Sequence, residues 1–376
     1  MKDSRPIPLA VPDLRGRELE YLQRCVHDNW VSSAGPFVTE LEEAVARNAG
    51  RCHGVAVVNG TAALHLALLA AGVRPGDFVI VPDWTFAASA NAVYHCGAIP
   101  YFVDIATDSW TLDPGMLADV LKRSKEPIAA VLAVDTLGHP ADYDALAQAA
   151  GTVPIVSDAA GSIGAFYKGQ PTGAFGACAT LSFNGNKTVT AGGGGMVLID
   201  DDEVAQRIRH LSTQARVGAD YLHDERGFNY RMTNVNAAIG LAQLERLSEL
   251  VEAKQTIARR YDDFVATCPH MEAMPRLPWA ESSCWLYSVA VTNAETAAGL
   301  LRYLNDRGVG ARSFWRSLSA QGPYSDSPAA LTGVSRQLSG RVVSLPCSTD
   351  LAVSDQYRII DLLSAWYPDA VSASSP

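Results

Sequence analysis

The stretch GVAVVNGTAALHLALLAA, residues 54–71, contains an apolar run, a polar turn and an Ala/Leu-rich segment in direct succession. Residues 54–58 show little polar alternation, which is the pattern of a strand buried on both faces. Residues 61–71 open with Thr61, which is able to cap a helix N-terminus, and predict a helix. A buried strand that runs straight into a helix is the repeating unit of a helix-covered parallel sheet, so the stretch predicts an α/β fold.

The same alternation continues through the first half of the chain. Further strands are predicted at 78–82, 99–103, 128–134 and 155–157, and further helices at 87–96 and 114–124. Asp113 and Pro114 are a typical N-cap and first helical residue for the last of these helices. Strands and helices in this order predict a mostly parallel sheet covered on both faces, with ligands at the carboxyl ends of its strands.

The pattern changes in the second half. Residues 235–260 place apolar side chains on one broad stripe, so we expect one long helix there. Beyond it, residues 285–291 predict a strand and residues 295–307 a helix. A chain of 376 residues is long enough for two domains. We expect a large α/β domain at 1–255 and a smaller α+β domain at 256–376.

Composition and charge exclude several classes of protein. Hydrophobic residues make up 48% of the chain and charged residues 19%, which is incompatible with wholesale disorder. The 30 basic and 40 acidic residues give a net charge of −10, so neither nucleic acid nor an anionic membrane is an expected partner. No apolar run reaches the roughly 18 residues of a spanning helix, and the N-terminus lacks the apolar core of a signal peptide.

The cysteines and histidines show no metal-binding pattern. Seven cysteines are dispersed along the chain without a C-x-x-C pair, which favours reduced thiols in a cytoplasmic protein. Neither H-E-x-x-H nor a cluster of His and Cys is present. We therefore expect a cytoplasmic protein without a metal site.

Two polar motifs follow predicted strands directly. The turn at Gly60 and Thr61 leads into a helix, whose free N–H groups and dipole can hold a phosphate, although an ordinary capped helix has the same appearance. Asp158 ends the strand at 155–157 and is either a cap or a catalytic carboxylate. Because both follow parallel strands, both are expected at the same edge of the sheet.

Two further motifs lie later in the chain. In SFNGNKTVTAGGGGM, residues 182–196, Lys187 stands among Ser, Asn and Thr and is followed by four consecutive glycines. Such a run costs backbone entropy, so it indicates either a close approach of the chain to another group or a flexible loop. A strand at 196–199 follows at once, which disfavours a linker. Residues 227–232 (GFNYRM) form a polar and aromatic entry to the long helix.

Together these motifs fit pyridoxal phosphate (PLP). PLP needs a lysine for its Schiff base, an acid for its ring nitrogen and a cup for its phosphate. Lys187, Asp158 and the turn at Gly60 and Thr61 can supply these three parts. An Asp–pyridinium pair keeps the ring electron-withdrawing, and a released lysine can act as the base that moves the proton. The sequence therefore predicts a PLP-dependent enzyme.

The chain resembles the DegT/DnrJ/EryC1/StrS family of PLP-dependent sugar aminotransferases. Five blocks carry the resemblance in the family's order and spacing: NGTAALHLAL (59–68), PDWTFAASANAV (82–93), SDAAGSIGAFYKG (157–169), SFNGNKTVTAGGGGM (182–196) and NYRMTNVNAAIGLAQLERL (229–247). The resemblance implies the aspartate-aminotransferase fold (PLP fold type I), with a large domain on a mostly parallel sheet and a smaller C-terminal α+β domain. It also implies a homodimer with two shared active sites.

The resemblance also assigns residues. Lys187 looks like the Schiff-base lysine, and Asp158 like the partner of the pyridinium nitrogen. Phe86 falls at the position that stacks on the cofactor ring, and Asn229 at the position that reaches the phosphate of the neighbouring subunit. The cofactor-binding set implied in this way is Gly60, Thr61, Phe86, Asp158, Ser182, Asn186, Lys187 and Asn229.

Three segments depart from the family pattern. Gly161 stands where many members have Gln, His or Glu, which can reach the phenolic oxygen of the cofactor, so another group or water must serve. VDTLGH (134–139) replaces a strand-end motif similar to VHLYG. Four glycines (192–195) replace the commoner GEGG.

WVSSAG (30–35) and the NGNK form look like the legionaminic- and bacillosamine-type subgroup. This resemblance implies ping-pong transfer of an amino group from L-glutamate to C4 of a nucleotide-linked 4-keto-6-deoxyhexose. A 3-keto sugar or a cyclitol ketone is an alternative acceptor. A PLP- or PMP-dependent sugar dehydratase is disfavoured, because known dehydratases of this fold have histidine at position 187, and a non-catalytic protein would not need the retained site. The candidate substrate residues are Ser32, Ser33, Trp84 and His139, of which Trp84 can equally pack in the core.

Overall fold

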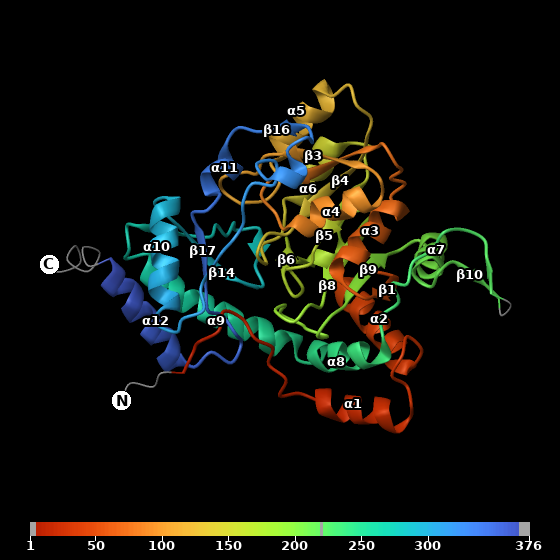
Figure 1. The fold of residues 1–376 in the computed structure, drawn as a ribbon, viewed down its shortest axis with the longest axis horizontal. Coiled ribbons are helices and arrows are strands. Elements are labelled where there is room, and N and C mark those ends of the chain that lie inside the picture. Colours follow the sequence, from red (N-terminus) through yellow and green to blue (C-terminus); the bar gives the residue numbers. More distant parts are fainter. Residues whose placement is uncertain (1–4, 219–220, 368–376) are drawn as a thin grey trace.

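A computed structural model describes residues 5–218 and 221–367 (Figure 1). Its largest element is an eight-stranded sheet in the order β1-β9-β8-β5-β4-β2-β3-β16. The strands are β1 (His53–Val57), β2 (Phe78–Pro82), β3 (Ile99–Val103), β4 (Ile128–Val134), β5 (Ile155–Asp158), β8 (Cys178–Ser182), β9 (Gly195–Ile199) and β16 (Ala329–Ala330). Neighbours from β8 to β16 run parallel, whereas β9 is antiparallel to β1 and β8. The predicted α/β fold with a mostly parallel sheet is confirmed.

Helices cover both faces of this sheet (Figure 1). One face carries α3 (Gly60–Ala70), α4 (Ala87–His95) and α7 (Asp202–Ser212), and the other α2 (Pro36–Ala49), α5 (Pro114–Arg123), α6 (Tyr143–Ala150) and α8 (Asn234–Leu244). Successive strand side chains point to opposite faces, so Val55 and Val57 join the core under α3 while Ala56 joins the core under α2. The near-continuous apolar runs of the sequence reflect this burial on both sides.

One of the two predicted helix caps is correct. Asp113 caps α5, and its carboxylate accepts from the backbone N–H groups of Gly115 and Met116. Thr61 does not cap α3: the helix begins at Gly60, and the side chain of Asn59 accepts from Ala62 N at 2.8 Å. Thr61 instead lies in the first turn of the helix.

The long helix predicted at 235–260 is two helices, α8 and α9 (Leu247–Val265). Between them Arg246 has φ −106° and ψ 11°, which interrupts the helix. The Arg246 guanidinium binds the carboxylate of Asp13 at 3.1 Å and that of Glu249 at 2.7 Å. The apolar stripe continues across the break, so hydrophobic periodicity did not reveal it.

The C-terminal part is built on a second, antiparallel sheet in the order β12-β14-β17-β15. It comprises β12 (Met271–Ala273), β14 (Tyr287–Val291), β17 (Val342–Leu345) and β15 (Arg312–Ser313), with α9, α10 (Ala294–Asn305) and α12 (Val353–Trp366) around it. The strand and helix predicted at 285–291 and 295–307 correspond to β14 and α10. The boundary predicted at residue 255 falls inside α9, and β16 returns to the edge of the main sheet beside β3. The two-domain division stays a prediction.

The remaining elements are short or peripheral. They are α1 (Glu18–His27), α11 (Val334–Leu338), the 3-10 turns at Thr172–Ala174 and Gly322–Tyr324, the small sheet of β6 (Phe166–Tyr167), β7 (Gln170–Pro171) and β13 (Ala280–Glu281), and the hairpin of β10 (Arg216–Val217) and β11 (Leu222–His223). The hairpin projects from the edge of the molecule farthest from the C-terminal part (Figure 1). None of the helices in the described ranges is long and apolar enough to cross a membrane.

Candidate active site

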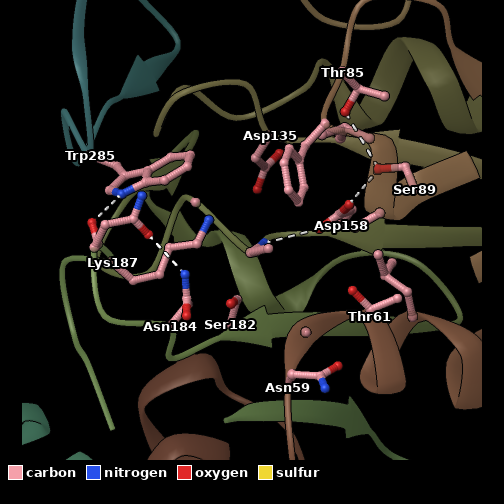
Figure 2. Close-up of a pocket in the computed structure, with 18 of the residues that line it drawn as sticks. Asn59, Thr61, Thr85, Ser89, Asp135, Asp158, Ser182, Asn184, Lys187 and Trp285 are labelled. Atoms are coloured by element: carbon pink, nitrogen blue, oxygen red, sulfur yellow. Dashed lines mark hydrogen bonds between the residues drawn. The ribbon is translucent and has the colours of Figure 1, made fainter. Parts of the chain in front are cut away.

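A cavity of about 300 Å³ lies at the carboxyl ends of the parallel strands (Figure 2). Strand ends and helix N-termini of the main sheet form most of its wall, and the C-terminal part closes one side. The residues that line it are Asn59, Gly60, Thr61, Leu64, Thr85, Phe86, Ala88, Ser89, Val134, Asp135, Asp158, Ala160, Gly161, Ser182, Asn184, Asn186, Lys187, Trp285, Phe314 and Trp315.

Asp158, the last residue of β5, supplies a buried carboxylate to this cavity. It is 5% exposed, and Ser89 Oγ on α4 donates to its Oδ2 at 3.0 Å. The backbone N–H of Ala160 donates to Oδ1 at 3.3 Å. Burial raises the pKa of Asp158, and the bond from Ser89 and the charge of Lys187 oppose that rise. The carboxylate is therefore held by few partners and can accept a hydrogen bond or charge from a bound molecule.

Lys187 lies in the loop between β8 and β9 and extends into the same cavity (Figure 2). Its backbone N–H donates to Asn184 O at 3.0 Å, which turns the chain so that the side chain points inward. Burial lowers the pKa of Lys187 to about 7, while the charge of Asp158 acts in the opposite direction. An amine with a pKa near neutrality can be both nucleophile and base at physiological pH.

The N-terminus of α3 faces the cavity beside the end of β8. The first N–H groups of a helix have no partner within the helix, and here they belong to Gly60 and Thr61, which line the cavity. A Cβ atom on Gly60 would lie 2.9 Å from Ser182 Cβ, so only glycine allows the helix to begin this close to Ser182. The backbone groups and the hydroxyl of Ser182 together form a site suited to an anion.

The second half of the four-glycine run after Lys187 passes very close to neighbouring groups, whereas a Cβ atom on Gly192 or Gly193 would meet nothing closer than 3.8 Å. Gly194 has φ +153°, and a Cβ atom there would lie 2.3 Å from Met232 Cε. A Cβ atom on Gly195 would lie 2.5 Å from the backbone oxygen of Asn59. Gly195 also pairs with Val57 on β1 and with Ser182 on β8. Of the two interpretations of this run, close approach is the one that the structure supports.

Asp135 is a second buried carboxylate in the cavity wall. It follows β4, and Tyr143 Oη donates to its Oδ1 at 2.7 Å while Ser162 Oγ donates to its Oδ2 at 2.6 Å. Burial raises the pKa of Asp135 to about 7, a rise that the charge of Asp158 reinforces. In the sequence, Asp135 stands out only as part of a departure from a family motif.

Seven of the predicted cofactor residues line this one cavity; they are Gly60, Thr61, Phe86, Asp158, Ser182, Asn186 and Lys187. Phe86 is 60% exposed, as expected for a ring that has a free face. The eighth, Asn229, is exposed and lies outside the lining. Its backbone pairs with Thr213, beside the projecting hairpin.

The four predicted substrate residues lie outside the cavity lining. Trp84 is fully buried and its Nε1 donates to Trp315 O at 2.9 Å, so the core packing considered for it is what the structure shows. His139 is also buried, with Nδ1 2.7 Å from Pro140 O and Nε2 accepting from Leu277 N. Ser32 and Ser33 are exposed in the loop before α2.

Several cavity residues were not identified from the sequence. Ser89 lies one helical turn after Phe86 in the quoted block PDWTFAASANAV, so helical spacing was a usable signal. Trp285 comes from the C-terminal part, and nothing local in its sequence indicates a pocket. Phe314 and Trp315 stand where the resemblance to the family implies the sugar-binding segment, although the segment departs from the usual aromatic-proline pattern there. Trp285 also occupies the space beside Gly161: a Cβ atom on Gly161 would lie 2.6 Å from Trp285 Cε3. Glycine at position 161 therefore makes room for an indole.

The residues present fit PLP. Asp158 offers a buried carboxylate for a ring nitrogen, Lys187 an amine for an aldehyde, and the α3 N-terminus with Ser182 an anion site. Across the described residues, no group of three or more His, Cys, Asp or Glu side chains is placed to hold a metal ion. An amine, a buried carboxylate and an anion site in one cavity together suit an organic phosphate cofactor.

Comparisons with known proteins agree with this chemistry. The DegT/DnrJ/EryC1/StrS aminotransferase family matches residues 12–364. GDP-perosamine synthase from Caulobacter vibrioides is 36% identical over 96% of this chain and 99% of its own length, and EpsN of Bacillus subtilis, named as a pyridoxal phosphate-dependent aminotransferase, is 36% identical over 96% and 95%.

A solved structure supports the same assignment. A protein named as a sugar aminotransferase from Streptococcus pneumoniae has been solved in PLP and PMP forms. Its PMP form superposes with a TM-score of 0.90 at 26% identity, covering 98% of this chain and 99% of that one. Family, fold and cofactor chemistry agree, and the chain belongs to the DegT/DnrJ/EryC1/StrS family as a PLP-dependent sugar aminotransferase.

Proposed function

We propose that this enzyme transfers an amino group from L-glutamate to C4 of a nucleotide-linked 4-keto-6-deoxyhexose. The observation that carries the proposal is the placement of Lys187 and Asp158 in one cavity, next to an anion site on α3. The relatives named as GDP-perosamine synthases, 33% to 37% identical to this chain, support a nucleotide-linked sugar as the acceptor.

Each site residue has a proposed task. Asp158 would hold the ring nitrogen of PLP, Lys187 would bond its aldehyde carbon, and Gly60, Thr61 and Ser182 would bind its phosphate. When bound, PLP supplies an electron sink for the carbanion at the amino-acid α-carbon. Lys187, with its pKa near 7, would take the proton from that carbon and deliver it to the cofactor carbon that carried the aldehyde. Burial of both charged groups strengthens these interactions, because little water competes with them.

The C-terminal part supplies the acceptor side of the cavity. Phe314 and Trp315 line it from a segment that joins the two sheets, and aromatic faces pack well against the apolar face of a sugar ring. These two side chains are therefore proposed substrate contacts in place of Trp84 and His139.

A ketosugar panel tests the proposal. The purified enzyme, with PLP and L-glutamate, should release 2-oxoglutarate and form a product with the mass of the amino sugar when given a nucleotide-linked 4-keto-6-deoxyhexose. Lys187→Ala should lose this turnover and the visible absorbance of bound PLP. Turnover only with a 3-keto sugar or a cyclitol ketone would overturn the assignment of the acceptor but not that of the transaminase. Dehydration without release of 2-oxoglutarate would overturn the reaction class for this acceptor.

We further propose that the enzyme is a homodimer in which Asn229 reaches the phosphate site of the neighbouring subunit. Two features support this arrangement. Asn229 is exposed and outside its own subunit's cavity, and the nearby hairpin exposes Tyr221 and Leu222, 74% and 57% exposed. Exposed apolar side chains gathered on a projecting element are typical of a surface that a partner covers. The expected cytoplasmic location stays a prediction.

A further inference from the structure

Trp285 makes an unusual contact with Lys187 in the cavity (Figure 2). The Nζ of Lys187 lies 3.4 Å from the centroid of the indole, over its face. Trp285 is 6% exposed and comes from the segment before β14, in the C-terminal part. Gly161 lies against the same indole ring, and any side chain at position 161 would overlap the ring. The indole and the glycine therefore form a matched pair beside the lysine.

The indole is held in this position from two directions. Its Nε1 donates to the backbone oxygen of Asn186, the residue before Lys187, at 2.7 Å. The backbone oxygen of Trp285 accepts from the Nζ of Lys254 at 3.0 Å. Lys254 is 3% exposed and also donates to the backbone oxygen of Cys347 at 2.9 Å. The indole of Trp285 is thus bonded to the loop that carries Lys187, and the backbone of Trp285 is bonded to α9.

The charged groups around Lys187 do not supply a close counter-ion in the direction of the ring. Asp158 and Asp135 line the cavity at the ends of β5 and β4, and Ser89, Tyr143 and Ser162 already donate to them. Behind the lysine, Asp13 and Lys254 line a small neighbouring pocket, and Asp13 is paired with Arg15 and Arg246. The group that faces the ammonium at contact distance is the π face of Trp285.

We propose that Trp285 is a positioning residue for Lys187, whose indole face binds the lysine's free ammonium and holds it at the cavity wall whenever the amine is not bonded to the cofactor. A cation over an indole is attracted by the negative face of the ring, and the attraction is strongest where water is excluded. The inference rests on the role proposed for Lys187. It adds that the C-terminal part controls the resting position and proton affinity of the catalytic amine.

A graded fluorination series at Trp285 tests this directly. Site-specific replacement by mono-, di- and tetrafluorotryptophan weakens the negative face of the ring stepwise with little change in shape. In the cofactor-free protein, the proton affinity of Lys187 is measured as the pH dependence of its acylation by a small reagent, followed by peptide mass spectrometry. We expect the apparent pKa of Lys187 to fall with each step, to a roughly ten-fold loss of proton affinity for the tetrafluoro ring. A constant pKa across the series would overturn the proposal.

Two controls separate the π face from other effects. Tetrafluorotryptophan at position 315, which lines the same cavity, should leave the pKa of Lys187 unchanged because Trp315 packs on Trp84 instead. A benzothiophene analogue at 285 keeps a π face but removes the N–H bond to Asn186 O, and should retain most of the proton affinity. If tetrafluorotryptophan at position 315 shifted the pKa of Lys187 as much as it does at position 285, the shift would be a general effect of fluorine, and the proposal would be overturned.

The role of Lys187 itself is tested separately. Borohydride reduction of the PLP-loaded wild-type enzyme should fix the cofactor covalently on the peptide that contains Lys187. Labelling of another lysine would refute the proposed function. Labelling of Lys187 together with a flat fluorination series would leave the proposed function intact and refute only the role of Trp285.

Discussion

At the scale of single residues, the cavity contains two buried carboxylates, Asp158 and Asp135, which differ in their hydrogen-bond donors and neighbouring charges. Asp158 has one side-chain donor, Ser89, and the charge of Lys187 favours its ionised form. Asp135 has donors from Tyr143, Ser162 and the backbone of Ala141, but the charge of Asp158 disfavours its ionised form. Burial raises the pKa of both, and for Asp135 to about 7. Asp158 is thus the carboxylate suited to remain ionised beside a cationic ligand, and Asp135 the one suited to hold a proton near neutral pH.

Ser89→Ala should move the acid limit of PLP binding to higher pH. The hydroxyl donates to Asp158 at 3.0 Å and favours the ionised carboxylate, so its loss raises the pKa of Asp158. A hydrogen bond to a charged group contributes about 1.5–3 kcal/mol, which corresponds to roughly one to two pH units. PLP affinity measured by absorbance between pH 4 and 8 checks this. Ser89→Thr, which keeps a hydroxyl donor at this position, is the control and should leave the limit close to that of the wild type.

Asp135→Asn should change how stability depends on pH. The folded protein holds a proton on Asp135 up to about pH 7, while the unfolded chain releases it near pH 4, so the wild type loses stability as pH rises between these values. The variant cannot ionise. The variant should therefore gain stability relative to the wild type as the pH rises: the difference between their free energies of unfolding, variant minus wild type, should be about 2 kcal/mol larger at pH 8 than at pH 5.

Urea unfolding at the two pH values measures this difference. The exposed Asp108→Asn is the matched control and should show no such change between pH 5 and 8. A pH-independent difference for Asp135→Asn would show that Asp135 is ionised in the folded protein throughout this range.

At the scale of elements, the anion site exists because two backbones meet. The start of α3 and the start of β9 touch at Asn59 and Gly195, and α3 touches the end of β8 at Gly60 and Ser182. A side chain at Gly60 or at Gly195 would overlap the neighbouring segment. The helix N-terminus, the end of β8 and the glycine run therefore form one rigid unit.

Gly195→Ala should destabilise the protein and weaken PLP binding together. Its Cβ would lie 2.5 Å from Asn59 O, a backbone atom that cannot move without displacing the N-terminus of α3. Overpacking of this kind costs about 1–3 kcal/mol. Gly185→Ala is the matched control in the same loop, because a Cβ there meets nothing within 4 Å, and it should be close to neutral. Thermal unfolding and PLP titration of both variants measure the contrast, and equal behaviour would contradict the rigid unit.

At the scale of the whole molecule, the cavity is assembled from both halves of the chain. The main sheet contributes Asp158 and the α3 turn, and the C-terminal part contributes Trp285, Phe314 and Trp315. The proposed dimer would add Asn229 from the second subunit. The active site then depends on three surfaces that must all be placed correctly.

Mixed dimers should recover activity if the sites are shared. Lys187→Ala removes the amine within one subunit, and Asn229→Asp would place a negative charge at the phosphate site of the other. Each variant alone should be nearly inactive. Coexpressed at equal amounts, random assortment should leave about a quarter of all sites intact, because one site of each mixed dimer carries neither change. Activity well above that of either variant, measured as 2-oxoglutarate release, is the expected result.

The control for that experiment is the assembly itself. Native mass spectrometry should show mixed dimers of about twice the 40.1 kDa chain. Confirmed mixed dimers without recovered activity would contradict the contribution of Asn229 to the partner's site. A protein that sediments as a single chain would contradict the dimer.

The fold class and the family could be predicted from the amino-acid sequence. Strand and helix periodicity are local properties, so the α/β order, the strands of the first half and the cap at Asp113 could be predicted from short windows. Parallel strands present their carboxyl ends at one edge, so Asp158 and the α3 turn could be predicted to lie together. Lys187 joined them through the three groups that PLP needs and through the resemblance to the family.

Features that depend on contacts between distant parts of the chain could be seen only in the folded molecule. Ser89 reaches Asp158 across 69 residues of sequence, Trp285 reaches Asn186 across 99, and Arg246 reaches Asp13 across 233 at the break between α8 and α9. The same applies to Trp84 and His139, whose polar atoms are engaged with backbone groups of the core rather than with the cavity. A local sequence pattern does not reveal these hydrogen-bond partners, because the packing of the complete chain brings them together.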